Sequence, residues 1–350
     1  MQLSDFDYHL PEESIAQEPL ADRAGARMLV VYRHQGNWED RLFRDLPEFV
    51  GPGDCLVLND SRVFPSRLYG HRGGMYSLPV GKKNPARRTY LSGEVEVFLL
   101  RPVSSDGRDW QALVRPGRKI RTGERIFFAD GLDAEVIARG DFGERTIRFH
   151  GERDLYEEFE KIGHVPLPPY IKRADEAGDR DRYQTVFARE RGSVAAPTAG
   201  LHFTPEVLER CRAAGADVAF VTLHVGLGTF QPIHTEQFEG HRLHSETFQI
   251  TPENSARIHA ARRLVAVGTT SVRTIETSTE PTTGETDIFI YPGYRFRATG
   301  AMLTNFHLPR TSLLLLVCAF GGKELVLAAY RHAVEAGYRF YSYGDCMLLI

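Results

Sequence analysis

The sequence of 350 residues has few cysteines and no long apolar run. Its four cysteines are scattered without a Cys-x-x-Cys pair, which argues against a disulfide framework and against a thiolate metal site. The longest apolar run, residues 313–320, is far below the roughly 18 residues that span a bilayer. The N-terminus holds Asp5 and Asp7 and no basic stretch, so no secretory signal is visible. We therefore expect a cytoplasmic protein with free thiols and no membrane partner.

The short motifs of several enzyme classes are also missing. The sequence contains no P-loop, no His-Glu-x-x-His zinc motif and no nucleophile elbow. His241 and His244 form a His-x-x-His pair without an acidic partner at helical spacing, so we expect no metal site. The histidines of the second half are better candidates for binding polar substrates or for acid–base chemistry than for holding a metal.

A large net charge is absent, but the charge is unevenly distributed. The formal net charge is −3, yet residues 62–125 hold 14 Lys and Arg against 5 Asp and Glu. A basic segment inside an otherwise acidic chain favours a polyanionic partner. No RRM or KH signature accompanies it. On charge alone, a solvated surface and a nucleic-acid surface are equally good interpretations.

Two different sequence patterns, in different parts of the chain, indicate the fold. Between residues 68 and 150, short alternating segments separated by glycine or charged turns are typical of a small barrel or sandwich. Elsewhere Thr204 and Thr251 each precede Pro-Glu as predicted helix N-caps, and each helix leads into a buried strand. This alternation predicts a mostly parallel sheet covered by helices. We predict a discontinuous α/β domain of residues 1–61 and 155–350, with a β domain inserted at 62–154.

Two loops rich in small residues each carry one histidine. They are GSVAAPTAGLHFT, residues 192–204 with His202, and TLHVGLGTF, residues 222–230 with His224. Loops that follow strands of a parallel sheet meet at its carboxyl edge, where ligands bind. A lone histidine is more often a core residue, but glycine-rich surroundings make a packing role less natural. We interpret both histidines as site candidates.

A third loop joins the predicted buried strand at 265–268 to a helix that we expect to begin near Ser271. Backbone N–H groups at that helix start, with Thr269, Thr270 and Arg273, would suit an anion. Plain capping of the helix is the alternative interpretation, at equal weight.

Other candidates depend on shorter stretches. Glu246, in the predicted strand HRLHSETF, suits a general base or an acceptor for ribose hydroxyls, although on this stretch alone a satisfied surface glutamate is the somewhat better explanation. Asn305 and His307 precede an apolar helix. The aromatic C-terminal segment is core, or holds one ring that stacks on a base. Residues 182–184 face a cleft or belong to a linker.

Taken together, these stretches resemble one known family nearly end to end. The S-adenosylmethionine:tRNA ribosyltransferase-isomerase family of queuosine biosynthesis is similar in the segments NDSRVFPSRLYG, PLPPYIKR, DRYQTVFA, AAPTAGLHFT, LHVGLGTF, HSE, GTTSVRTIE, TDIFIYPGYRF, TNFHLP and YSYGD. So many long motifs in one order are highly specific. The resemblance implies an α/β/α sandwich with an inserted antiparallel β-barrel.

The resemblance also implies a reaction. The family transfers and isomerises the ribosyl part of S-adenosylmethionine onto 7-aminomethyl-7-deazaguanine at the wobble position of tRNA, giving epoxyqueuosine and releasing adenine and methionine. S-adenosylmethionine is consumed as a substrate, so no permanently bound cofactor and no metal are expected. The partners would be tRNA and S-adenosylmethionine, and we expect a monomer.

Roles for individual residues follow from the matching motifs. His202, His224 and Glu246 are the acid–base candidates, and the two glycine-rich loops are expected to be two walls of the S-adenosylmethionine pocket. Contacts to tRNA are expected from Arg115, Arg118, Lys119 and Arg121 of the basic barrel. The remaining expected substrate-binding residues are Asp60, Arg62, Arg67, Arg182, Tyr183, Gln184, Pro197, Thr198, Gly200, Phe203, Gly226, Gly228, Thr229, Phe230, His244, Ser245, Thr269, Thr270, Ser271, Arg273, Asn305, His307, Tyr343 and Asp345.

Two departures from the family pattern and two other functions remain open. Leu243 replaces the family's usual methionine, a swap that conserves volume. The stretch 73–93 is longer than the family's hairpin and is either a surface loop or an added tRNA contact.

A catalytically silent RNA-binding protein of the same fold would bind tRNA without releasing adenine. A hydrolase of adenine nucleosides would release adenine without tRNA.

Overall fold

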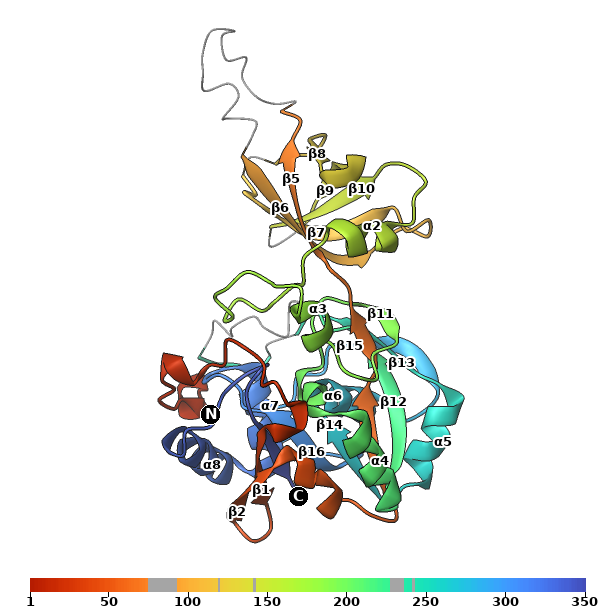
Figure 1. The fold of residues 1–350 in the computed structure, drawn as a ribbon. Coiled ribbons are helices and arrows are strands. Elements are labelled where there is room, and N and C mark those ends of the chain that lie inside the picture. Colours follow the sequence, from red (N-terminus) through yellow and green to blue (C-terminus); the bar gives the residue numbers. More distant parts are fainter. Residues whose placement is uncertain (75–92, 119, 141–142, 227–235, 241–242) are drawn as a thin grey trace. The chain divides into compact units, whose positions relative to one another are not determined.

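The computed structural model describes residues 1–350 apart from 75–92, 119, 141–142, 227–235 and 241–242. It divides into two compact units: Met1–Arg62 with Pro168–Ile350, here called the α/β unit, and Val63–Leu167, the barrel unit (Figure 1). We expected the insertion to end at 154, but the barrel unit continues to Leu167 because helix α2 (Leu155–Ile162) packs on the barrel. The ring of Phe159 lies 5.3 Å from the rings of both Trp110 and Phe149.

The barrel unit is a closed barrel in the strand order β10-β7-β6-β5-β8-β9, and each neighbouring pair is antiparallel. Along β7, Trp110, Ala112 and Val114 point inward and are buried, whereas Arg115 is exposed. The predicted inserted antiparallel barrel is therefore confirmed. Its strands are β5 (Arg67–Arg72), β6 (Glu94–Pro102), β7 (Asp109–Arg115), β8 (Arg125–Phe127), β9 (Asp133–Arg139) and β10 (Glu144–Phe149).

The α/β unit is built on a nine-stranded sheet in the order β15-β13-β12-β3-β14-β16-β17-β1-β2. Its central strands β12, β3, β14 and β16 are parallel, as predicted. The prediction is wrong for the flanks, because β13, β15 and β2 run antiparallel to their neighbours, as does β17 to β16. The strands are β1 (Arg27–Tyr32), β2 (Asn37–Leu42), β3 (Asp54–Asn59), β12 (Asp217–Leu223), β13 (Glu246–Ile250), β14 (Arg263–Val267), β15 (Thr282–Thr286), β16 (Thr299–Asn305) and β17 (Cys346–Leu349). A separate pair joins β4 (Ser61–Val63) to β11 (Glu190–Ser193).

Helices cover both faces of this sheet, which makes the predicted sandwich. Successive residues of a strand point to opposite faces, so Cys55 and Val57 of β3 join one core while Leu56 and Leu58 join the other. The first core packs under α5 (Pro252–Ala260), α6 (Thr269–Thr277), α7 (Ser312–Gly321) and α8 (Lys323–Glu335). The second packs under α4 (Pro205–Ala213) and the 3₁₀ segments η4 (Phe43–Glu48) and η7 (Thr198–His202).

Shorter elements complete the described chain: η1 (Leu3–Phe6), η2 (Glu12–Ser14), η3 (Arg23–Gly25), η5 (Ala129–Gly131) and α3 (Asp179–Arg182). Within the described ranges, no single helix has the length and apolarity that a membrane crossing requires. Helices α7 and α8 meet that requirement only as a pair, and the chain bends by 115° between them.

The helix starts differ in one respect that matters for the site. Thr204 and Thr251 cap α4 and α5 as predicted, each accepting a backbone N–H bond of 3.3 Å at its side-chain oxygen. Helix α6 begins at Thr269, two residues before the expected start. Its N-cap position is Gly268, which has a φ of +87° and no side chain to cap the helix. The first N–H groups of α6 therefore lack a side-chain cap.

Candidate functional site

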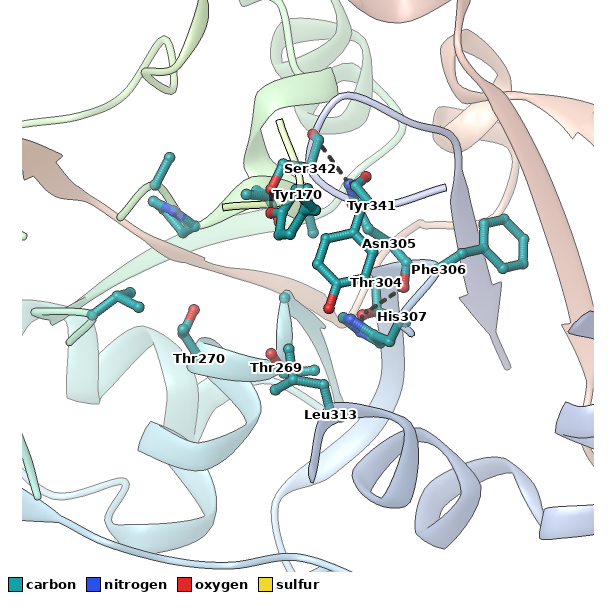
Figure 2. Close-up of a pocket in the computed structure, with 16 residues that line it drawn as sticks. Tyr170, Thr269, Thr270, Thr304, Asn305, Phe306, His307, Leu313, Tyr341 and Ser342 are labelled. Atoms are coloured by element: carbon teal, nitrogen blue, oxygen red, sulfur yellow. Dashed lines mark hydrogen bonds between the residues drawn. The ribbon is translucent and has the colours of Figure 1, made fainter. Parts of the chain in front are cut away.

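A pocket opens in the α/β unit at the carboxyl edge of the parallel strands. The space between its lining residues is about 490 Å³, with open solvent at its mouth included (Figure 2). Its walls come from the residues after β12, β14 and β16, from the segment that enters η7, and from the turn before β17. Six of the expected site residues line it: Pro197, Thr198, Thr269, Thr270, Asn305 and His307.

The two glycine-rich loops lie side by side and form part of the same wall. The N–H of Val194 donates to the carbonyl of Val225 at 3.2 Å, and the N–H of Val225 donates to Oγ of Ser193 at 3.0 Å. Gly192 has a φ of +138°, and a Cβ there would lie 3.0 Å from the His224 ring. Small residues thus allow the two backbones and the His224 ring to come together.

The start of α6 supplies unpartnered hydrogen-bonding groups next to the pocket. Thr269 and Thr270 line it, and Oγ1 of Thr270 and Oγ of Ser271 are buried without a hydrogen-bond partner among the described residues. Arg273 lies one helical turn further along α6 and is only 2% exposed. Its Nε and Nη2 atoms also have no hydrogen-bond partner among the described residues. Uncapped N–H groups together with a buried cation form an environment that favours an anion.

Glu246 occupies the other side of Arg273. Its Oε2 accepts from Nη1 of Arg273 at 2.5 Å, and its Oε1 accepts from the backbone N–H of Gly226 at 2.8 Å. Both side chains are 3% exposed, so this is a buried, charge-assisted contact. Glu246 therefore fixes Arg273 and the second glycine-rich loop, and does not line the pocket.

His202 lies behind the pocket wall, buried against Phe43, with the two rings 5.3 Å apart. Its Nε2 is 3.1 Å from Oδ1 of Asn305, which does line the pocket. Burial lowers the pKa of His202 to about 4, so the ring is neutral at pH 7. His307 faces the pocket, its Nε2 is 2.8 Å from Oγ1 of Thr304, and burial lowers its pKa to about 3.

His224 flanks the wall at Val225 without lining the pocket itself. Its Nδ1 is buried and has no hydrogen-bond partner among the described residues. Burial lowers the pKa of His224, which outweighs the opposite effect of Glu190 and Asp60. The ring is thus a neutral imidazole with an available nitrogen.

A smaller pocket on the other side of η7 gathers three more expected residues, Arg182, His202 and Tyr343. The hydroxyl of Tyr343 donates to Oδ1 of Asp179 at 2.8 Å, and Arg23 also lines this pocket. The ring of Tyr183 is buried against that of Tyr343. The expected residues that line a pocket are therefore divided between the larger pocket and this smaller one.

Several expected site residues make contacts within the fold. Asp60 pairs with Arg189 at 2.6 Å and accepts from Thr222, and Oδ1 and Oδ2 of Asp345 accept backbone N–H bonds from Arg27 and Arg339. Outside the pocket lining as well are Arg62, Gln184, Gly200, Phe203, Gly226, His244, Ser245, Ser271 and Arg273. Gly200 and Phe203 are packed in the interior, and Ser245 is exposed and bonded to Glu285.

Arg67 belongs to the barrel unit, where its Nε lies 3.5 Å from Oε1 of Glu96. Arg115, the last residue of β7, is exposed, as are Arg118 and Arg121 on the loop that leads to β8. Lys119 and the expected pocket residues Gly228, Thr229 and Phe230 lie outside the described residues.

Sequence reasoning missed the aromatic part of the pocket. Tyr170 and Tyr341 line it with Ser342, and none of the three was singled out. The PLPPYIKR segment suggests a domain junction, and the aromatic C-terminal segment suggests core or one ring that stacks on a base, but the sequence does not distinguish Tyr341 from its aromatic neighbours. The available signal was an aromatic residue beside a glycine turn, which ordinary core packing also produces.

Comparison with known proteins identifies the family. The profile described as "Queuosine biosynthesis protein" matches residues 3–349. A Solibacter usitatus protein named S-adenosylmethionine:tRNA ribosyltransferase-isomerase is 74% identical, with 100% of both chains covered. The protein of that name from Symbiobacterium thermophilum is 50% identical, again over 100% of both chains.

The chain belongs to the S-adenosylmethionine:tRNA ribosyltransferase-isomerase family. A crystal structure of the S-adenosylmethionine tRNA ribosyltransferase from Thermotoga maritima matches with a TM-score of 0.54 and 35% identity, covering 99% of this chain and 100% of the other. The resemblance drawn from the sequence motifs is therefore confirmed, as is the class of transferase and isomerase enzymes of tRNA modification.

Proposed function

We propose that this protein transfers and isomerises the ribosyl part of S-adenosylmethionine onto 7-aminomethyl-7-deazaguanine at the wobble position of tRNA, with release of adenine and methionine. The observation that supports this most is the pocket whose wall includes residues of both glycine-rich loops. It has an uncapped helix start and a nearby buried arginine at one side and aromatic rings at the other. A ligand with a carboxylate at one end and a purine at the other matches these two sides.

The methionine carboxylate of S-adenosylmethionine is proposed to bind at the start of α6. Backbone N–H groups and the hydroxyls of Thr270 and Ser271 would donate to it, and the charge of Arg273 would favour it. The sulfonium then acidifies the hydrogens on C5′, and a base removes one of them. Adenine leaves, the aminomethyl nitrogen of the modified base attacks the opened ribosyl group, and closure of the epoxide expels methionine.

Among the three candidates we propose His224 as the base on hydrogen-bonding grounds, although its ring does not line the pocket. Its Nδ1 is unpartnered among the described residues, and burial lowers its pKa, so the neutral form that accepts a proton is present at pH 7. Nε2 of His202 is engaged by Asn305, and both oxygens of Glu246 are engaged by Arg273 and Gly226.

Contact with tRNA is proposed for the loop between β7 and β8. The barrel unit as a whole is nearly balanced, with 18 Lys and Arg against 15 Asp and Glu in residues 63–167, so a general attraction is weak. Arg115 at the end of β7 and Arg118 and Arg121 on this loop are all exposed within seven residues of one another. Phosphate contacts from such a cluster position an RNA without reading its sequence.

The deciding experiment uses a tRNA anticodon stem-loop that carries 7-aminomethyl-7-deazaguanine, incubated with protein and S-adenosylmethionine and followed by mass spectrometry. Epoxyqueuosine, with adenine and methionine released only when both substrates are present, is the expected result. Adenine release without RNA would favour a nucleoside hydrolase. Tight RNA binding with no product would favour the silent RNA-binding protein. We also propose a cytoplasmic monomer, and the four free, buried cysteines suit a reducing compartment.

A further inference from the structure

Two tyrosines form one side of the pocket. The rings of Tyr170 and Tyr341 have centroids 3.9 Å apart and planes at 64°. The hydroxyl of Tyr170 is hydrogen-bonded to Oγ of Ser342, so the pair is tied to the turn that carries Tyr341. Figure 2 shows this pair on one side of the pocket, with Thr269 and Thr270 on the opposite side. The aromatic surface and the anion-favouring helix start therefore face the same cavity.

The backbone of Tyr341 is held in an unfavourable conformation. Its φ is +74°, a region that residues with a Cβ rarely adopt and that clusters at functional sites. Three hydrogen bonds keep it there. The N–H of Tyr341 donates to the carbonyl of Phe306, and its own carbonyl accepts from the N–H of Gly344 at 3.0 Å and from Nδ2 of Asn305 at 2.8 Å.

The same amide connects this turn to His202. A carbonyl oxygen can only accept, so the Asn305 nitrogen must be the atom that faces Tyr341, and Oδ1 then faces His202. Oδ1 can only accept, so Nε2 of His202 carries the hydrogen. Because burial keeps this histidine neutral, its tautomer is fixed with the hydrogen on Nε2. His202 thus orients Asn305, and Asn305 holds Tyr341.

We propose that Tyr170 and Tyr341 form the wall on which the purine ring of S-adenosylmethionine stacks, and that His202 is a positioning residue that holds this wall through Asn305. The proposal rests on the proposed function and adds the purine-binding residues to it. An aromatic face binds a purine by stacking, without needing a particular hydrogen-bond pattern. His202 lies behind the wall and reaches the pocket only through Asn305, which suits support better than proton transfer.

Binding of 5′-methylthioadenosine tests the wall directly. This probe carries the purine and ribose of S-adenosylmethionine but no carboxylate, and calorimetry measures its affinity without turnover. Tyr341→Leu should lower the affinity for both 5′-methylthioadenosine and S-adenosylmethionine by about tenfold or more. This is the loss expected when base stacking is removed. Tyr341→Phe should keep the affinity. Tyr294→Leu, a partly buried tyrosine outside the pocket lining, is the matched control.

The anion side supplies the contrasting variant. Thr270→Val should lower the affinity for S-adenosylmethionine and leave the affinity for 5′-methylthioadenosine unchanged, because only the first ligand has a carboxylate. If Tyr341→Leu, still folded by circular dichroism, binds 5′-methylthioadenosine as wild type does, the stacking wall is wrong while the proposed function stands. If wild-type protein binds neither ligand, the proposed function itself fails.

The supporting role of His202 has its own test. His202→Gln keeps a side-chain N–H donor for Asn305, whereas His202→Leu removes it. We expect His202→Leu to raise KM for S-adenosylmethionine several-fold with a smaller change in kcat, and His202→Gln to restore most of the affinity. Loss of kcat in both variants with unchanged KM would instead show that His202 takes part in proton transfer.

Discussion

Arg273 and Glu246 are paired at 2.5 Å in the interior of the α/β unit, and each side chain is 3% exposed. Two further donors of the same guanidinium have no partner among the described residues. A buried cation that uses one of its donor nitrogens for a carboxylate and leaves the others unpartnered is only partly satisfied by the protein. Among the described residues, Glu246 therefore satisfies only part of the hydrogen-bonding capacity of Arg273.

Removing one member of this pair should destabilise the protein. Glu246→Gln leaves the Arg273 charge buried without its counter-charge, and we expect the free energy of unfolding to fall by about 3 kcal/mol. The double variant Glu246→Gln/Arg273→Met removes both charges and should recover much of that loss. Urea unfolding measures both. A double variant no more stable than Glu246→Gln would mean that the pair does not act as a unit.

Stability should fall as the pH drops below neutrality because of His202. Its folded pKa of about 4 lies below the usual ~6.5, so the unfolded chain takes up a proton first. Above pH 6.5 both states are neutral and the effect vanishes. At pH 5 this difference in pKa lowers the free energy of unfolding by about 2 kcal/mol. The difference in unfolding free energy between pH 7 and pH 5 should therefore be smaller in His202→Gln than in wild type, and an equal difference would contradict the lowered pKa.

The loop arginines should govern the salt dependence of tRNA binding. Replacing Arg115, Arg118 and Arg121 by alanine is expected to weaken binding and to flatten the plot of log affinity against log salt. The slope should change by about 0.7 to 0.9 for each phosphate that is no longer neutralised. Fluorescence anisotropy at several salt concentrations measures this. Arg101→Ala removes an exposed arginine on β6 and is the control for a general change in charge. Identical slopes in the triple variant and the control would exclude this loop from the interface.

Arg145 supports the same loop from beneath. It is 4% exposed and donates to the carbonyls of Gly117, Gly143 and Glu144 at 2.8–3.0 Å. Arg145→Met leaves these carbonyls unsatisfied, so we expect barrel stability to fall by about 2 kcal/mol or more. Amide hydrogen exchange should also become faster in residues 115–121. Unchanged exchange there would show that the loop holds its conformation without Arg145.

Chelators should leave turnover unchanged. Across the residues that the structure describes, no group of three or more His, Cys, Asp or Glu side chains is arranged to hold a metal ion. Activity measured before and after dialysis against a chelator tests this. A decrease that added zinc or magnesium reverses would require a metal site.

The sequence was most informative where local chemistry decides structure. Thr204 and Thr251 were recognisable as caps because Pro-Glu follows each one, and the short alternating segments indicated the barrel. The antiparallel direction of the strands at the edges of the sheet could not be predicted from the sequence. The pairing of β13 with β15 depends on the whole sheet rather than on the residues of these two strands.

The candidate site shows the same division. The glycine-rich loops and the start of α6 line the same pocket, and their small residues and threonines are visible as a pattern in the sequence. Glu246, Asp60 and Asp345 were expected to meet substrate, yet each is engaged by an arginine or a backbone N–H from a distant segment. Spacing along the chain does not show which partner a carboxylate will find. The same limit explains why Tyr341 could not be distinguished within the aromatic C-terminal segment, because only the folded turn reveals its backbone conformation.

The position of β17 in the sheet has a consequence for synthesis. These four residues near the C-terminus, Cys346–Leu349, lie between β16 and β1, inside the sheet and not at its edge. While the ribosome is still making this segment, β1 and β2 have no link through the sheet to the parallel strands. Tyr341 and Asn305 are likewise joined only when the final turn folds. The part of the pocket wall that Tyr341 and Ser342 supply is therefore complete only when β17 has paired with β16 and β1.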